Sequence, residues 1–214
     1  MQVPIASCSG SDFFTHVPGG LPQPAASVMV EMCAIDRLLA EARNRRLTTS
    51  QFKMLTDARN AAQYRLLSLP DWEQLEPNER QACLLAVYEC CRITAVLYSN
   101  AVIFPLPTNT GWHERLIKSL RRLLETSNMM DWRLDVSALL TWTLFVGGIA
   151  SYRSPDRYFF ENTLRDVVHQ ERVKWSQVEA TLSMFLWSRQ ACDVGATVLW
   201  DAVSMDVGNV NRAL

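Results

Sequence analysis

The sequence predicts an all-α protein: a single compact domain of about seven or eight helices around two buried central helices. Three observations support this prediction. From Ala25 onward, apolar residues recur with helical spacing, and no segment alternates with the period of two that is typical of a strand. Residues 83–101 and 136–150 are apolar on nearly every side, as expected of helices that other helices surround. Prolines and capping residues divide the chain into segments of helical length.

Length and composition favour one folded domain with its own core. The 214 residues are 49% hydrophobic and 20% charged, which is a globular composition and well away from that of disordered chains. A chain of this length buries enough surface to be stable without a disulfide or a metal. The formal net charge is −1, so the chain lacks the basic excess with which DNA-binding domains neutralise phosphates. We therefore expect no direct nucleic-acid binding by these residues alone.

The chain is predicted to begin with an irregular arm over residues 1–24, followed by an all-helical domain over residues 25–214. The arm holds four prolines and three glycines, which remove backbone donors and cost backbone entropy. A first helix is expected over residues 27–46. Thr48 and Gln51 have the spacing of a capping box, which predicts that a second helix begins there and runs to the next proline.

The two central segments lie between helix breakers. Pro77 suits the first turn of the helix that contains residues 83–101, because its missing donor is not needed there, and Pro105 ends that helix. An amphipathic helix is expected over residues 112–127, and the second central helix over residues 136–151. The apolar run of this second helix is too short, and too interrupted by hydroxyl side chains, to indicate a membrane span.

Capping signals divide the C-terminal part into three further helices. The Ser-Pro-Asp run at 154–156 combines a cap, a first-turn proline and an acidic residue near the positive end of a helix dipole. Ser176 and Glu179 have the spacing of a capping box. Asp193 is expected to cap the last helix, which should end near Met205.

Cysteine and histidine residues form no recognisable catalytic or metal-binding motif. Zinc sites usually use two short Cys or His pairs, but the sequence has no C-x-x-C, and Cys90 and Cys91 diverge by about 100° on a helix. The six cysteines are expected to stay reduced and to pack as small apolar side chains. His113 and Glu114 do not begin an H-E-x-x-H motif, because Ile117 stands where the second histidine belongs. We expect no enzyme, no cofactor and no metal.

Gly147 and Gly148 lie inside an apolar helix, where glycine costs about 1 kcal/mol relative to alanine. Close approach of a neighbouring helix is the favoured explanation, and a ligand cavity is the alternative. The tryptophans nearby fit core stripes, and they could also share in an apolar pocket. The candidate effector pocket consists of Trp142, Phe145, Gly147, Gly148, Trp187 and Trp200.

Two surface features also have alternative interpretations. A row of basic residues on the helix over 112–127 is either a solvated face, which is the commoner case, or a contact for DNA phosphates or an acidic partner. The row consists of Arg115, Lys118, Arg121 and Arg122. The final helix is the candidate surface for self-association, because a terminal element is the easiest to leave partly uncovered.

Three stretches of the sequence carry a family resemblance. They read ECCRITAVLY at 89–98 followed by VIFPLP at 102–107, LLTWTLFVGGIA at 139–150, and LSMFLWSRQACD at 182–193. Together they resemble, in the family's order, the C-terminal regulatory domain of fungal binuclear zinc-cluster transcription factors. The resemblance covers roughly residues 88–203. The six-cysteine zinc cluster of that family is absent here, so neither zinc binding nor DNA recognition is transferred to any residue.

The resemblance implies an all-α domain that modulates RNA polymerase II transcription through partner or effector contacts. The implied partners are proteins of the transcription machinery or a second copy of the chain, together with a small-molecule effector. The implied location is the nucleus, or the cytoplasm if the chain stands alone. Because the zinc cluster is absent, the chain is either a fragment of a longer factor or a relative that has lost its DNA-binding module. The alternative hypothesis is a stand-alone helical small-molecule sensor, or an enzyme, with an apolar cavity and no membrane association.

Overall fold

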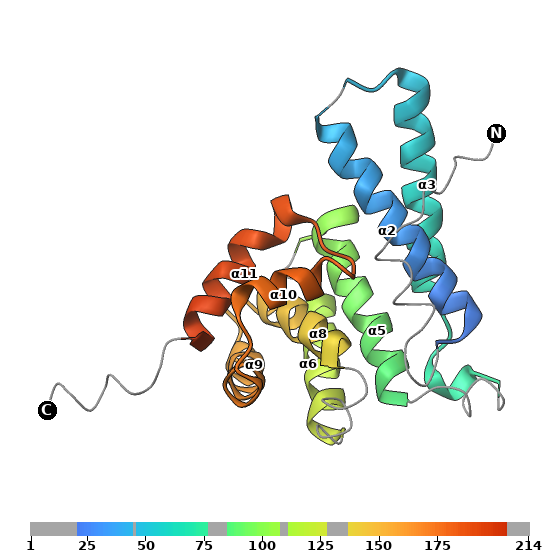
Figure 1. The fold of residues 1–214 in the computed structure, drawn as a ribbon. Helices are drawn as coiled ribbons and strands as arrows, with labels where there is room; N and C mark the ends of the chain where they lie inside the picture. Colours follow the sequence, from blue (N-terminus) through green and yellow to red (C-terminus); the bar gives the residue numbers. More distant parts are fainter. Residues whose placement is uncertain (1–20, 45, 77–84, 108–110, 128–136, 205–214) are drawn as a thin grey trace, which may run out of the picture.

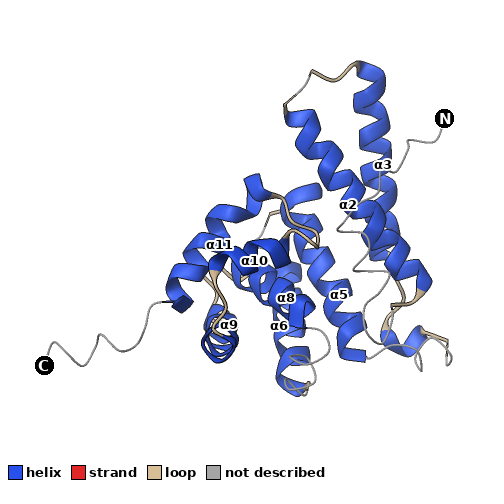
Figure 2. Ribbon diagram, in the orientation of Figure 1, coloured by secondary structure: helices blue, strands red, loops and turns tan. Residues whose placement is uncertain are grey.

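A computed structural model describes residues 21–44, 46–76, 85–107, 111–127 and 137–204. Within these ranges the chain forms eight α-helices and no strand, which confirms the all-α prediction (Figure 2). A short 3₁₀ turn, η1, and a π-helical turn, η2, complete the architecture. The elements are α2 (Gln23–Arg43), α3 (Thr49–Leu67), η1 (Trp72–Gln74), α5 (Leu85–Tyr98), η2 (Ser99–Ile103), α6 (Gly111–Thr126), α8 (Ser137–Ala150), α9 (Arg157–Glu171), α10 (Trp175–Leu182) and α11 (Arg189–Ser204).

The helices form a body and a projecting hairpin. In the body, α8 packs against α5, α6, α9, α10 and α11. The hairpin consists of α2 and α3, whose far ends extend away from the other helices (Figure 1). It joins the body where α2 contacts η2 and α3 contacts α5. The hairpin therefore rests on α5 and η2, whereas the rest of the fold is built around α8.

The helices α5 and α8 are the most deeply buried α-helices of the described chain. Eleven of the fourteen residues of α5 and nine of the fourteen of α8 are buried. Trp142 anchors α8: its side chain is fully buried, its Nε1 donates to the Leu186 carbonyl at 3.0 Å, and its ring stacks on Phe185. Burying an indole without a partner for its N–H is costly, so this hydrogen bond fixes the segment after α10 against α8.

Gly147 and Gly148 bring two helices close to α8. A Cβ at Gly147 would overlap the ring of Phe160 from α9, and a Cβ at Gly148 would lie 2.6 Å from a methyl group of Leu199 from α11. Both neighbours are fully buried. The glycines therefore allow close packing of the helices, which is the explanation that the sequence favoured.

The N-terminal boundary of the helical domain differs from the prediction. The first helix begins at Gln23, so the last two residues of the predicted arm are helical. Proline is tolerated in a first turn because its missing N–H has no partner there, and Pro24 occupies such a position. The predicted capping box is confirmed: Thr48 N donates to Gln51 Oε1 at 3.0 Å, and Gln51 N donates to Thr48 Oγ1 at 3.3 Å.

The first central helix does not run unbroken to residue 101. It ends as an α-helix at Tyr98 and widens into η2. Ser99 Oγ donates to Gln63 Oε1, and Gln63 Nε2 donates to Asn100 Oδ1 at 3.2 Å. This buried polar network ties the π-helical turn to α3, which is a tertiary contact that helical periodicity cannot reveal. Pro77 and Cys83, which the sequence places in the first part of this helix, lie outside the described residues.

Three predicted helix starts in the C-terminal part are wrong. The run 154–156 forms a turn, and α9 begins only at Arg157. The helix after it begins at Trp175, where the Gln177 side chain accepts from Lys174 N at 2.8 Å, so Ser176 is not the cap. Asp193 lies inside α11, and its carboxylate accepts from Trp187 Nε1 at 3.0 Å. The Asp193 carboxylate therefore binds the Trp187 side chain instead of capping the last helix.

A buried carboxyl group joins the hairpin to the body. Asp36 of α2 is buried near Tyr98 and Cys192. Burial raises its pKa, while the nearby Tyr98 hydroxyl and the charges of Arg43 and Arg37 oppose this rise. Because the pKa is raised in the folded state, protonated Asp36 stabilises the fold below the ordinary pKa of 3.8, and this contribution is lost as the pH rises through the folded-state pKa.

The glycine packing predicts the effect of a single methyl group. Gly147→Ala should lower the free energy of unfolding by about 1–3 kcal/mol, because overlap with the buried Phe160 ring outweighs the better helix propensity of alanine. Urea denaturation followed by circular dichroism measures this change. Gly111→Ala is the matched control, since a Cβ there meets nothing within 4 Å. Equal stability of the two variants would contradict the close-packing explanation.

The junction at Asp36 predicts a pH-dependent substitution effect. Asp36→Asn should raise the free energy of unfolding at pH 7, because it replaces a buried charge with a neutral group of the same shape. The advantage should shrink as the pH falls towards 3.8, where the native carboxyl group is itself protonated. Thermal unfolding at a series of pH values tests this. Glu41→Gln, on the exposed side of the same helix, should stay close to the parent protein at every pH.

Candidate functional site

A groove opens on the body of the described structure. Its volume is about 720 Å³, which lies within the range that small-molecule sites occupy. Side chains from the end of α5, from η2, from α6, from the end of α8 and from the start of α11 line it, together with the turn at 151–156. Segments that are distant in sequence thus meet around one cavity.

The groove has an apolar floor and a charged rim. The floor includes Leu97, Val102, Ile117, Val146, Ile149 and Trp187. Glu114, Lys118 and Arg153 stand at the rim and are exposed. This combination suits a ligand that buries an apolar body and keeps a polar end near water.

The turn that closes one side of the groove is held by several hydrogen bonds. Ser151 Oγ donates to the Gly148 carbonyl at 3.2 Å, and Asp156 N donates to Ser154 Oγ at 3.2 Å. The Asp156 carboxylate accepts from Arg121 of α6 at 3.0 Å. Arg153 lies between these anchors with a φ of 66°, in the left-handed region that is unfavourable for residues other than glycine. The turn thereby places a strained cationic residue at the rim.

His113 connects α6 to the end of α8 at the same groove. Its side chain is buried, and its Nε2 lies 3.0 Å from the Ala150 carbonyl. The last carbonyls of a helix have no partner within that helix. This contact therefore satisfies an α8 carbonyl and fixes the distance between two walls of the groove.

Only one of the six residues of the predicted pocket lines this groove, namely Trp187. Trp142 and Phe145 are fully buried in the core. Gly147 and Gly148 are covered by Phe160 and Leu199, as described above. The predicted pocket is therefore displaced: the cavity opens beside the C-terminal end of α8 rather than at its glycines.

The last predicted pocket residue, Trp200, belongs to an aromatic cluster. Its ring lies 5.5 Å from that of Trp175, which in turn lies 6.2 Å from Phe145. Phe145 also meets Trp187 edge to face. The aromatic residues at these helical positions thus pack together and join α8, α10 and α11.

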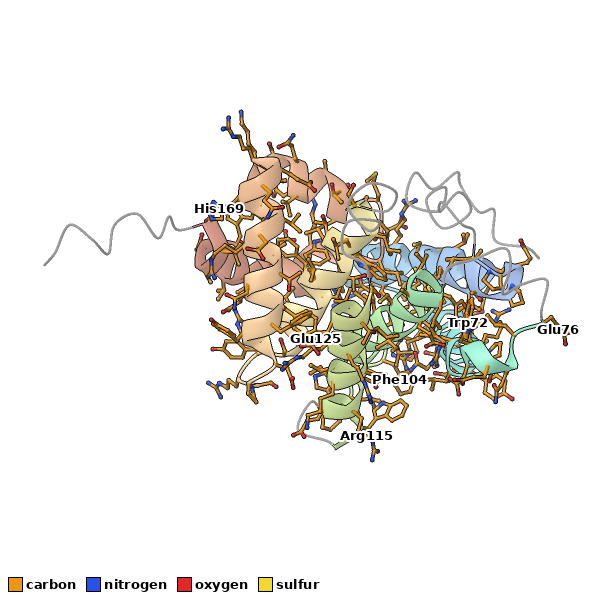
Figure 3. The ribbon with its side chains drawn as sticks, turned by 90° about the horizontal axis from the view of Figure 1, so that it is seen from below. Trp72, Glu76, Phe104, Arg115, Glu125 and His169 are labelled. Carbon is orange, nitrogen blue, oxygen red and sulfur yellow. The ribbon has the colours of Figure 1, made fainter. Side chains whose placement is uncertain are left out.

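The basic row on α6 is divided between structural and exposed roles. Arg121 bonds to Glu125 at 2.8 Å as well as to Asp156, so its charge is compensated. Arg115 lies near the opposite end of α6 from Glu125 (Figure 3) and is exposed. Lys118 lines the groove. The sequence identified Lys118 as part of this row but gave no sign that it borders a cavity.

A second hollow of about 430 Å³ lies between η1, α5 and α6. Several of its charged side chains already form hydrogen bonds or ion pairs within the protein. Glu89 accepts from Trp72 N at 2.9 Å and pairs with Arg92, which also pairs with Asp71. These contacts fix η1, on which Figure 3 labels Trp72, against α5. We therefore assign no ligand to this second hollow, because its charged side chains hold η1 against α5.

The thiols of the described chain are poor nucleophiles. The four described cysteines are all buried. Burial raises the pKa of Cys90 and of Cys91, and it raises the pKa of Cys192 to about 12. A thiol reacts as its thiolate, which such a pKa makes scarce at pH 7. The described ranges also contain no cluster of metal-ligating side chains and no helix long and apolar enough to cross a membrane.

Comparison with known families identifies the chain as a whole. The family described as the fungal-specific transcription factor domain matches residues 11–201. No curated protein and no solved structure matches the sequence. The match covers the helices of the described structure from the projecting hairpin to α11, apart from the last three residues of α11. The chain therefore belongs to the family of fungal-specific transcription factor domains.

Proposed function

We propose that this chain is the regulatory domain of a fungal transcription factor, and that it acts in the nucleus when joined to a DNA-binding module. It modulates RNA polymerase II transcription by binding an effector in the groove and by contacting protein partners. The observation that carries the proposal is a groove of about 720 Å³ with an apolar floor and a charged rim, in a domain of this family.

The position of the groove supports a regulatory role. A ligand there would touch α5, α6, α8 and α11 at once, so its binding energy could favour one arrangement of these helices over another. A ligand shifts a conformational equilibrium only by its differential affinity for the two states. A ligand that contacts several helices gains such a difference in affinity more readily than a ligand that contacts a single helix.

The cations at the rim indicate how a ligand would be oriented. Lys118 and Arg153 form no ion pair within the described residues, and Arg153 stacks over the Tyr152 ring at 5.4 Å. They are available to a polar or acidic end of the effector, while the floor holds its apolar part. A stand-alone small-molecule sensor would use the same groove and differs only in lacking an attached DNA reader. Burial raises the pKa of the Cys192 thiol that lines the groove to about 12, so this thiol is a poor nucleophile at neutral pH.

The proposal predicts that filling the groove changes transcription. Ala101 lines the groove from η2 and is exposed, so Ala101→Trp should occupy the cavity without disrupting the core. In a yeast reporter assay with the chain fused to a heterologous DNA-binding domain, this variant should change expression severalfold. Ala61→Trp, on an exposed position of α3, is the matched control and should leave expression unchanged. Identical expression from both variants, at equal protein levels, would rule out the groove as the regulatory site.

The same proposal predicts that the isolated chain does not recognise DNA. The net charge is −1, and Arg121 of the basic row is already paired, so few cations remain to displace counterions from a duplex. Fluorescence anisotropy with labelled duplex DNA at physiological salt should show no saturable binding at micromolar protein. Tight binding that weakens upon Arg115→Ala would instead assign the basic row to DNA phosphates.

A further inference from the structure

Two cations at the rim of the groove have no anionic partner among the described residues. Lys118 of α6 and Arg153 of the turn at 151–156 both line the groove and are exposed. Neither forms an ion pair within that part of the chain. By contrast, Arg121 beside the same turn pairs with Asp156 at 3.0 Å. The rim therefore offers two uncompensated positive charges to a ligand in the groove.

The backbone at Arg153 is held in an unfavourable conformation. Its φ of 66° lies in the left-handed region, which disfavours residues with a Cβ atom and which glycine adopts readily. Residues strained in this way persist where surrounding contacts hold them, and they occur preferentially at ligand sites. Here the contacts are those from Ser151 to the Gly148 carbonyl and from Asp156 N to Ser154 Oγ. The turn therefore maintains strain at the residue that brings a guanidinium group to the rim.

The Tyr152 ring limits where the Arg153 guanidinium lies. The guanidinium carbons of Arg153 and Arg157 are 5.4 Å and 5.3 Å from the centroid of this ring, and both cations are attracted to it. Arg157 also pairs with Glu161 at 2.6 Å. Of these two guanidinium groups, that of Arg153 is the one left to bind an anion. A planar guanidinium binds a carboxylate through two parallel hydrogen bonds.

The floor of the groove presents an aromatic ring in a fixed orientation. Trp187 lines the groove and is partly exposed. Its Nε1 donates to the Asp193 carboxylate at 3.0 Å, and the Phe145 ring packs against it edge to face. Val146 and Ile149 contribute aliphatic surface to the same floor. Aromatic rings attract one another in offset or edge-to-face contacts, so this floor suits an apolar body that contains an aromatic ring.

We propose that the groove binds a monocarboxylate with an aromatic body, and that Arg153 and Lys118 hold its carboxylate at the rim. This rests on the function proposed above, in which the groove takes an effector, and it adds the chemical class of that effector. Arg153 supplies a planar pair of donors and Lys118 a compact charge, which together match one carboxylate. Glu114 places a negative charge at the same rim, so it disfavours a ligand with a second carboxylate.

A matched series of compounds tests the charge of the ligand. Naphthaleneacetate, naphthaleneacetamide and naphthylethylamine share one aromatic body and differ in the charge of their polar end. In titrations of the intact chain followed by two-dimensional NMR, the acid should shift the Trp187 indole signal, with a dissociation constant on the order of 1 mM or tighter. The amide and the amine should bind roughly tenfold more weakly. Equal binding of the amide or the amine, or no shift with any of the three compounds, would overturn the proposal.

Arg153→Gly separates a binding role of this residue from a structural one. Glycine relieves the left-handed strain, so the variant should unfold at a slightly higher temperature than the parent protein. Because it lacks the guanidinium group, it should nevertheless bind naphthaleneacetate roughly tenfold more weakly. A variant that gains stability and binds the acid as tightly as the parent protein would show that Arg153 does not hold the carboxylate.

Arg172→Gly is the matched control for this substitution. Arg172 also has a positive φ, of 50°, but it follows the C-terminal end of α9 and does not line the groove. Relief of strain should stabilise this variant as well, whereas its affinity for naphthaleneacetate should equal that of the parent protein. An equal loss of affinity in Arg172→Gly and Arg153→Gly would attribute the effect to the backbone rather than to the rim charge, and would refute the proposal.

Glu114→Gln provides a test in the opposite direction. It removes the negative charge at the rim, so naphthaleneacetate should bind roughly threefold more tightly, while the affinity for the neutral amide should stay the same. Unchanged or weaker binding of the acid would contradict a carboxylate held at this rim.

These titrations are independent of the reporter assay with Ala101→Trp. If the acid has no advantage over the amide and the amine but Ala101→Trp still changes expression, the carboxylate is refuted and the groove remains the regulatory site. If the acid binds as expected but Ala101→Trp leaves expression unchanged, the ligand class is supported and the regulatory function of the groove is refuted.

Discussion

The body of this domain depends on how closely five helices can approach α8. Where α8 carries Gly147 and Gly148, the side chains of Phe160 and Leu199 occupy the space that Cβ atoms would fill. Interiors packed to this density leave little room for rearrangement. The positions of α9 and α11 are therefore fixed relative to α8, and the aromatic cluster of Phe145, Trp175 and Trp200 fills the space beside them.

Buried polar groups determine how the remaining elements attach to this packed centre. The indole of Trp142 holds the segment after α10 through the Leu186 carbonyl. Gln63 holds η2 against α3 through Ser99 and Asn100. Because a buried polar group without a partner is costly, each of these bonds selects one arrangement among several that apolar packing alone would tolerate. Together with the apolar side chains that α2 and α3 contribute to the core, these bonds give the hairpin a defined orientation.

The groove and the hairpin lie on different parts of the molecule. The groove lies at the end of α8, where the chain turns through 151–156 and the helices no longer fill the space between them. The hairpin contacts the body through α5 and η2. The turn η2 connects the two parts, since it lines the groove and also bonds to Gln63 of α3.

The sequence by itself determined the helical class, most helix positions and the deep burial of the segments that form α5 and α8. These properties arise from local rules, because the helical period and the Thr48 capping box involve residues within a few positions of each other. The family resemblance seen in three stretches was likewise confirmed by the match to residues 11–201. The role of the glycines followed from the cost of glycine in a helix, even though the neighbours that cover them were unknown.

Only the tertiary structure decided where the groove lies, why the first central helix widens at Ser99, and which partner the Asp193 carboxylate takes. Each of these depends on residues that are distant in sequence, such as His113 beside Ala150 or Gln63 beside Asn100. Periodicity shows which side of a helix is buried, but it does not show which helix covers that side or where the covering is incomplete. A cavity is a gap between elements, so it is determined by their packing and not by any one segment.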